Sequence, residues 1–334
     1  MSKRNYEMQQ RITLILRLVA EDMLYGISLG TSSIDRSRLE HRRWLPMEDI
    51  IVRPPKEKDK IDCYKVYETG FPDVDKLTFD GFSRWWNRSK ISGELERLWR
   101  VAVVGDEIVG IAINLMLRSL GWGAIWELVV VPEWRKKGIG RELVAKSEET
   151  FVSLNRALTH FAIALKTHSM DAISFVEGLG YGIQSLILRL DGPTAVQPEE
   201  CELQVGIARL EHIPLFIHLE PDTYWGRRDR DAWEYTIRGG NCYALSEPES
   251  NMVVGFIHLE PAPDAGDATV ISFSYREGYG RDVVKAALYE TKTEKTVFWV
   301  QDSHEEILDY LYAEGFIRAE SEFLAKKRVM YSGE

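Results

Sequence analysis

The sequence predicts an α/β protein in which two related units follow a helical extension. The 334 residues exceed the usual length of a single domain, so two domains are expected. Short β-branched runs alternate with longer stretches of helical periodicity, as in an α/β fold. An order of hairpin, strand, glycine-containing turn and helix occurs in the first half and returns in weaker form in the second.

Residues 1–48 are predicted to form a helical extension, with one long amphipathic helix near residues 6–25. Its apolar stretch is interrupted by Arg17 and is too short to span a bilayer. It also lacks the small-residue cleavage site that follows the apolar core of a signal peptide. Two partners for its apolar face stay open: the rest of the chain, or a second copy in a homodimer.

Composition narrows the class of protein. The formal net charge of -10 argues against general nucleic-acid binding, which needs a basic face, and it is compatible with a cationic amine substrate. The cysteines, three in number, show no C-x-x-C spacing, so neither a disulfide framework nor a zinc site is expected, and a reducing, cytoplasmic location is the simplest interpretation. The histidines form no H-E-x-x-H pattern. We therefore expect no metal, no nucleic acid and no membrane among the partners.

An apolar run meets a basic, glycine-containing turn at residues 129–141, V-V-V-P-E-W-R-K-K-G-I-G-R, and a helical pattern follows. The first N–H groups of a helix lack intrahelical acceptors, and the helix dipole places partial positive charge there. Gly138 and Gly140 let an anion approach the backbone closely. Full positive charges surround the same point on Arg135, Lys136, Lys137 and Arg141. The pattern predicts a phosphate site.

The pattern Leu128-x-Val130-x-Pro132, followed by Arg135-x-x-Gly138-x-Gly140, resembles the acyl-CoA loop of the GNAT superfamily of N-acetyltransferases. A hairpin at 101–114, a short strand at 161–165 and the segment 172–181 resemble further features of that family in the same order. The resemblance covers roughly residues 49–193. It implies a mixed, mostly antiparallel twisted sheet flanked by helices, with acetyl-CoA as the acyl donor.

The resemblance also implies where CoA would bind. Pantetheine would pair with the backbone of Leu128–Val131, whose N–H groups would also stabilise the oxyanion of acyl transfer. The implied CoA-binding residues are Leu128, Val129, Val130, Val131, Arg135, Lys136, Lys137, Gly138, Ile139, Gly140, Arg141 and Ser169. Ser169 stands where the family often has asparagine, and it is also expected to cap the next helix. A Rossmann site is set aside because Leu143 replaces the third glycine.

Glu127 is the candidate catalytic residue. The implied reaction is direct attack of a primary amine on the thioester in a ternary complex, and an amine with a pKa near 10 must first lose a proton. Strand alternation puts the Glu127 side chain on the face opposite Leu128 and Val130. Two roles stay open for this carboxylate: general base, directly or through a water, or a group that orients the substrate.

The usual general acid of the family is missing. Its tyrosine on the last helix corresponds to Val176 in F-V-E-G-L-G-Y, while Tyr181 is expected to pack in the core. His168 is an alternative acid or a surface residue. A CoA thiol is acidic enough to leave without an obligatory acid, so the enzyme interpretation stands. The alternative is a non-catalytic acyl-CoA-binding or regulatory protein.

Residues 191–200, D-G-P-T-A-V-Q-P-E-E, are rich in Pro, Gly and acidic residues, and a linker is predicted at 194–200, with a second, degenerate GNAT-like domain at 201–334. Gly278 follows Gly138 by 140 residues, and Gly315 follows Gly180 by 135. A gapless alignment at Gly278 puts Tyr275 at the position of Arg135 and Ser272 at that of Pro132, so phosphate binding there is doubtful.

The acceptor is expected to be a small-molecule or peptide amine. Helices are predicted at about 59–69 and at 79–86, and in the resembling family they cover one side of the acceptor pocket. Trp85 and Trp86 on the second of these helices either line that pocket or pack in the core, which large aromatic side chains usually do.

Overall fold

The computed structural model describes residues 50–70, 77–194, 201–221, 227–262 and 268–331. The helix expected near residues 6–25 lies outside the described residues, and so does most of the expected linker. We call residues 50–193 the first lobe and residues 201–331 the second lobe.

The described part of the first lobe contains, in order, β1 (Ile50–Arg53), α2 (Lys60–Glu68), α3 (Phe79–Ile91), α4 (Glu94–Arg97), β2 (Arg100–Val104), β3 (Glu107–Leu117), β4 (Trp122–Val130), α5 (Ile139–Leu154), β5 (His160–Lys166), α6 (Met170–Glu177) and β6 (Gly182–Pro193). The described part of the second lobe contains β7 (Gln204–Ile207), α7 (Ile213–Leu219), α8 (Arg230–Gly239), β8 (Cys242–Ser246), β9 (Val253–Ala262), β10 (Ala268–Tyr275), α9 (Gly280–Glu290), β11 (Lys295–Gln301), α10 (Glu305–Ala313) and β12 (Ile317–Arg328).

Local sequence explains the limits of α3, which contains the predicted helical residues 79–86 and extends beyond them. The Thr78 side chain accepts a hydrogen bond from the Gly81 N–H at 3.2 Å, which satisfies one of the unpaired donors of the first turn. The helix then runs to Ile91 and stops before Gly93, whose φ of 74° leaves the helical region.

All the described strands belong to one sheet with the order β1-β2-β3-β4-β5-β12-β6-β11-β10-β9-β8-β7. The pairs β4·β5 and β10·β11 are parallel, and the other neighbouring pairs are antiparallel. The expected mixed, mostly antiparallel fold is therefore confirmed.

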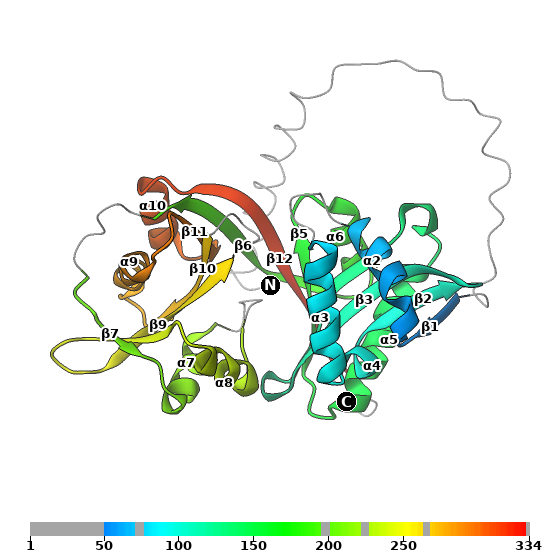
Figure 1. The fold of residues 1–334 in the computed structure, drawn as a ribbon, viewed down its shortest axis with the longest axis horizontal. Helices are drawn as coiled ribbons and strands as arrows, with labels where there is room; N and C mark the ends of the chain where they lie inside the picture. The colour runs from blue at the N-terminus through cyan, green and yellow to red at the C-terminus, as the bar shows by residue number, and fades with distance from the viewer. Residues whose placement is uncertain (1–49, 71–76, 195–200, 222–226, 263–267, 332–334) are drawn as a thin grey trace, which may run out of the picture. The chain divides into compact units, whose positions relative to one another are not determined.

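The two lobes exchange their last strands. Strand β12 of the second lobe lies between β5 and β6, and strand β6 of the first lobe lies between β12 and β11 (Figure 1). Each lobe thus supplies the strand that covers the edge of the other lobe's fifth strand, and the backbone groups of that edge find partners.

The central pair β6·β12 is nearly self-complementary. Ile187 pairs with Glu322, its own counterpart at the 135-residue offset, and Leu186 and Leu188 pair with Phe323 and Ser321. At the 135-residue offset, Ser321 is the counterpart of Leu186 and Phe323 is the counterpart of Leu188, so each of these two pairs is the repeat of the other. Two copies related by a local twofold axis have this property. The register supports the internal repeat that the glycine spacing predicted.

Helices cover the two faces of the first-lobe sheet. Leu128 and Val130 pack in the cluster that contains Ile139 and Leu143 of α5. On the other face Gly70, just after α2, lies against Val129, so closely that a Cβ at Gly70 would be 2.6 Å from a Val129 methyl carbon. Successive β4 residues therefore face α5 and α2 in turn.

The tryptophans of α3 pack in the core of the first lobe and do not line a pocket. Trp86 is completely buried, with its ring 5.8 Å from that of Trp99, and Trp85 is half-buried in an edge contact with Trp99 at 5.3 Å. Neither tryptophan lines the cavity beside Glu127 that is described below. The pocket-lining alternative for them is therefore wrong.

Gly192→Ala tests the exchange of strands. An alanine Cβ at Gly192 of β6 would lie 2.4 Å from the buried ring of Phe316, just before β12, so overpacking should lower the free energy of unfolding by about 1–3 kcal/mol. Urea denaturation measures the change. The matched control is Gly239→Ala in α8, where a Cβ meets no atom within 4 Å, and it should change the free energy by less than about 1 kcal/mol. Equal effects of both substitutions would contradict the packing at Gly192.

Candidate functional site

Strands β4 and β5 pair over only part of their length. Their parallel register runs from Trp122 opposite His160 to Ile125 opposite Ile163 and ends there. At the next position β4 has a bulge relative to β3, which leaves Trp126 without a counterpart. Bulges bend a strand and increase its twist. Beyond Trp126 the two strands diverge, and the β5 side of β4 lacks a paired strand.

Two backbone positions of β4 face the gap between the strands. The Val131 N–H donates to the Val109 carbonyl of β3 at 3.1 Å, so the N–H and C=O groups of alternate residues, Leu128 and Val130, point away from β3. The Val130 carbonyl accepts a hydrogen bond from Arg135 Nε at 2.9 Å on that side. Residues 128–131 were expected to pair with a ligand through their backbone. Of these four, Leu128 and Val130 point their backbone groups into the gap.

The turn after β4 ends in a helix N-terminus. Lys136 has a φ of 62° and Gly138 a φ of 88°, a region that glycine adopts without steric cost. The first intrahelical bond of α5 joins the Glu142 N–H to the Gly138 carbonyl at 3.1 Å. The N–H groups of residues 139–141 precede that bond and are available to an anion.

The basic side chains of the turn are exposed around this N-terminus. Lys136 Nζ lies 3.0 Å from the Asp171 carboxylate, with both side chains largely exposed, and Lys137 Nζ lies 4.1 Å from the centre of the Trp134 ring. Arg141 is exposed on the first turn of α5. The structure therefore brings the predicted turn residues together in the geometry of an anion site.

Glu127 lines a cavity of ≈ 440 Å³ that opens where β4 and β5 diverge. Its side chain leaves the face opposite α5, because Leu128 packs toward that helix. Among the described residues Glu127 has no hydrogen-bond or ion-pair partner. The lining includes side chains and backbone of Gly70, Trp126, Glu127, Leu128, Ile163, Ala164, Leu165, Lys166, His168, Ser169, Ala172, Phe175, Val176, Arg189, Trp299, Glu320 and Glu322.

Three of these lining residues belong to the second lobe and were missed by sequence reasoning: Trp299 of β11, and Glu320 and Glu322 of β12. No motif marks them, because they reach the cavity only through the exchange of β6 and β12. The sequence signal was an alternation of charged and uncharged residues along residues 317–322.

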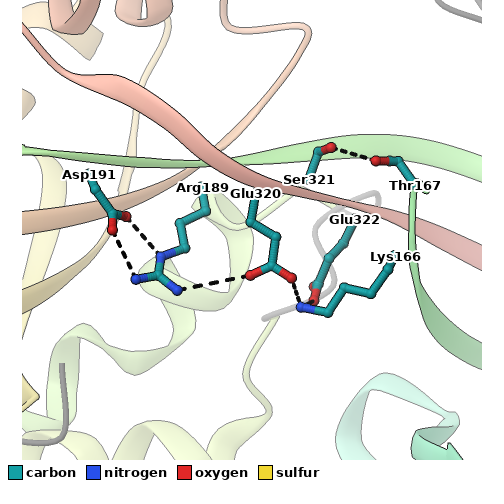
Figure 2. Close-up of polar contacts among 7 residues, drawn as sticks. All are labelled: Lys166, Thr167, Arg189, Asp191, Glu320, Ser321 and Glu322. Carbon is teal, nitrogen blue, oxygen red and sulfur yellow. Dashed lines mark hydrogen bonds and ion pairs between the residues drawn. The ribbon is translucent and has the colours of Figure 1, made fainter. Parts of the chain in front are cut away.

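A chain of ion pairs connects the lobes across this cavity (Figure 2). Lys166 Nζ lies 2.9 Å from the Glu322 carboxylate and also pairs with Glu320. Arg189 binds Asp191 in a bidentate pair, at 2.8 and 2.9 Å, and lies 3.9 Å from Glu320. The side chains of Lys166, Glu320 and Glu322, which line the cavity, are thus held by ion pairs between strands of the two lobes.

The surroundings of Glu127 change its proton affinity. Burial, and then the negative charge of Glu322, raise the pKa of Glu127 to about 8, while Lys166 opposes the rise. A carboxylate with such a pKa can both accept and release a proton near neutral pH.

The remaining candidates of the last helix are placed as follows. Val176, at the position of the family tyrosine, is buried and lines the cavity. Tyr181 is buried, and its hydroxyl donates a hydrogen bond to the Glu148 carboxylate at 2.9 Å. Burial raises the pKa of Tyr181 above its ordinary value, so this residue belongs to the core as expected. Ser169 and His168 line the cavity, but the Ser169 side chain makes no capping hydrogen bond, so that expectation is wrong.

The sheet register corrects the gapless alignment of the second lobe. Tyr275 pairs with Gly255 of β9 as Val130 pairs with Gly110 of β3, and each lies 145 residues after its counterpart. Tyr275 thus occupies the position of Val130 and not of Arg135. The second turn has lost five residues, which include the counterparts of the basic segment.

The same register places Ser272, opposite His258, at the position of Glu127, opposite Ile113. Ser272 therefore replaces the carboxylate and not Pro132, and β10 has no bulge against β9. A Cβ at Gly280 would lie 2.8 Å from the Tyr275 ring, whose hydroxyl bonds to His304. Side chains of the lobe itself thus occupy the space before α9.

Two absences concern only the described part of the chain. It contains no group of three or more His, Cys, Asp or Glu side chains arranged to hold a metal ion. None of its helices has the length and apolar character needed to cross a membrane.

The pKa of Glu127 should respond in opposite directions to loss of its two charged neighbours. Glu322→Gln removes a negative charge and should lower this pKa, whereas Lys166→Met removes a positive charge and should raise it. Titration of ¹³C-labelled glutamate carboxyl groups by NMR measures both shifts, with Glu127→Gln identifying the signal. Shifts in the same direction would contradict the placement of Glu322 and Lys166 beside Glu127.

Comparison with known proteins agrees with this geometry. A family model described as "Acetyltransferase (GNAT) family" matches residues 61–181. That range extends from α2 to the end of α6, and it includes the diverging strands, the basic turn and Glu127. No curated protein sequence matches the chain.

Solved structures share the whole fold. A GCN5-related N-acetyltransferase from Sphaerobacter thermophilus superposes with a TM-score of 0.62 at 16% identity, over 85% of this chain and 96% of that one. A GCN5-related N-acetyltransferase from Kribbella flavida gives 0.55 at 15% identity, over 84% and 72%.

A tandem GNAT protein from the clavulanic acid biosynthesis pathway gives a TM-score of 0.54 at 14% identity, over 85% of this chain and 99% of that one. Identities this low show the fold alone. The family model and the shared fold together show that residues 61–181 form a domain of the acetyltransferase (GNAT) family, in a chain with the fold of a tandem GNAT protein.

Proposed function

We propose that the chain is a cytoplasmic acyl-CoA-dependent N-acyltransferase that transfers an acetyl group from acetyl-CoA to a primary amine, with the first lobe active. One observation carries the proposal: residues 127–141 combine three features in one short segment. They are the β4 backbone that β5 does not pair, the N-terminus of α5 that follows this backbone, and the ionisable carboxylate of Glu127, which faces away from α5.

The residues of this segment suit the parts of an acyl-CoA. The N–H groups at the start of α5, with Arg135, Lys136, Lys137 and Arg141, would hold the pyrophosphate. The N–H and C=O groups of Leu128 and Val130 would pair with the amide groups of pantetheine. A backbone N–H that faces the gap would then stabilise the oxyanion when the thioester is attacked.

Glu127 would accept the proton of the acceptor ammonium, so that the free amine attacks the thioester carbon. Formation of the C–N bond gives a tetrahedral oxyanion whose nitrogen still carries a surplus proton. The C–S bond then breaks as the carbonyl re-forms, CoA leaves as a thiolate, and the surplus proton passes from the nitrogen to that thiolate or to water. Val176 cannot donate a proton to this thiolate, but a thiolate needs no obligatory acid to leave. The second lobe has Ser272 in place of Glu127 and a shorter turn, which supports a structural role for that lobe.

Gly138→Ala and Gly278→Ala test which of the two turns binds CoA. Both glycines have positive φ, 88° and 92°, and at both a Cβ meets no protein atom within 4 Å, so the backbone cost is similar. The methyl group at position 138 would project into the proposed phosphate site. Calorimetry should show that CoA affinity falls about tenfold in Gly138→Ala, from about 1–2 kcal/mol of lost binding, and is unchanged in Gly278→Ala. The reverse pattern would move the site to the second lobe.

Glu127→Gln tests the chemistry. CoA release with an amine panel should fall by about 10²–10⁴-fold while CoA affinity is retained, since glutamine cannot accept a proton. Because the Glu127 carboxyl must be ionised to act as a base, kcat/KM of the wild type should rise with pH through about 8, and this limb should vanish in the variant. The exposed Glu107 provides the control Glu107→Gln.

A non-catalytic acyl-CoA-binding protein is the second candidate, and the apolar Val176 favours it. If the wild type binds CoA tightly but acylates no amine of the panel at any pH, the enzyme proposal fails and the binding role replaces it. If Glu127→Gln keeps full activity with the limb near pH 8, Glu127 only orients the acceptor.

A further inference from the structure

A second cavity adjoins the one beside Glu127. It has a volume of ≈ 190 Å³ and shares three lining residues with the first cavity: Trp126, Ile163 and Ala164. A ligand that enters beside Glu127 can therefore continue along β4 and β5 into the second cavity.

The two cavities differ in their charged lining residues. The second cavity is lined mostly by apolar side chains of β3, β4, β5 and β12, such as Ala124, Ala162 and Leu324. Its charged lining residues are Arg227 and Arg228, just before α8, and its described lining contains no carboxylate. The combined space holds carboxylates together with Lys166 and Arg189 at the Glu127 end, is apolar in the middle and is basic at the far end.

Arg228 is the residue that points to a ligand. Its guanidinium is stacked on the Trp233 ring at 4.5 Å, and no described carboxylate lies within ion-pair distance of it. Its Nη1 atom is buried without a hydrogen-bond partner among the described residues. Arg228 is half-buried, and a buried N–H donor without an acceptor is costly, so a guanidinium held against a cavity wall in this way favours an anion.

The buried carboxylate of Glu220 binds the Arg228 backbone and makes no ion pair with its guanidinium. Glu220 is almost fully buried, and one of its oxygens accepts from the Arg228 backbone N–H at 2.7 Å and from the Trp233 indole N–H at 3.3 Å. Burial raises the pKa of Glu220 to about 7, against the effect of Arg228. Burial and then the charge of Arg228 lower the pKa of His258 to about 4, so His258 is neutral at pH 7.

We propose that the acceptor is an amine whose other end is an anionic group, with the amine beside Glu127, an apolar middle over Ala124 and Ala162, and the anion on Arg228. This inference rests on the proposed acyl transfer and names its substrate class. Ala124 lies three residues before Glu127 on β4, so an acceptor that passes Ala124 toward Arg228 must span at least roughly 10 Å. An ω-amino carboxylate has this form.

The test compares matched acceptors with acetyl-CoA as donor. The probes are the ω-amino acids from 4-aminobutanoate to 8-aminooctanoate, with the n-alkylamines and α,ω-diamines of equal length, and CoA release is measured. The wild type should prefer an amino carboxylate to its matched alkylamine by about 10- to 100-fold in kcat/KM, the usual effect of a charge-assisted hydrogen bond.

Arg228→Met should abolish this preference, mainly through a higher KM for the amino carboxylate, with CoA affinity and alkylamine turnover unchanged. Arg228→Lys keeps the positive charge and should retain part of the preference for amino carboxylates. The control is Arg238→Met on α8, whose guanidinium is exposed and pairs with Glu234 at 2.5 Å, and it should behave as wild type. Circular dichroism checks that each variant is folded.

Each outcome decides a different statement. If alkylamines or diamines are acylated as well as amino carboxylates, the substrate class is wrong while the acyl transfer stands. If hexanoyl-CoA is preferred to acetyl-CoA and Arg228→Met has no effect on acceptors, the second cavity holds an acyl chain. If no amine is acylated, the proposed function itself fails. In the expected case hexanoate competes with the acceptor in the wild type and not in Arg228→Met.

Discussion

Backbone hydrogen bonding at the centre of the sheet is the constraint on which the rest of the structure depends. An uncovered edge of β5 or β11 would leave a row of buried N–H and C=O groups without partners. In this chain β12 covers β5 and β6 covers β11, so neither lobe completes its own sheet. The exchange ties the stability of each lobe to the other, and it also brings Glu320 and Glu322 to the face of β5 that carries Lys166.

The same constraint explains why the candidate site lies beside β4. Strand β5 is paired with β12 on its other edge over its whole length, from His160 to Lys166, so β5 keeps backbone partners where β4 leaves it after Ile125. The bulge at Trp126 produces this divergence. The gap then exposes the backbone edge of Leu128 and Val130, while Glu127 faces the cavity that β12 lines. The proposed backbone contacts and the candidate base thus lie on adjacent residues of one strand.

The second lobe keeps the strands and helices of the first lobe but lacks several features of the candidate site. Its strands, its turn glycine Gly278 and its helix α9 match the first lobe, and both turn glycines have nearly the same φ. The bulge, the carboxylate and five residues of the turn are missing, and Tyr275 packs against Gly280. In return this lobe provides β12, Trp299 and Arg228 to the two cavities beside Glu127.

The sequence by itself determined the fold class, the strand-turn-helix unit with its basic turn, and the face on which Glu127 lies, because periodicity and glycine positions are local properties of the backbone. It also revealed the repeat, but a gapless alignment misplaced Tyr275 and Ser272, since a lost turn and a missing bulge appear only in strand register. The partners of Glu127 were decided by tertiary structure alone. Glu322 follows Lys166 by more than 150 residues, and only the pairing of β12 with β5 brings their side chains together.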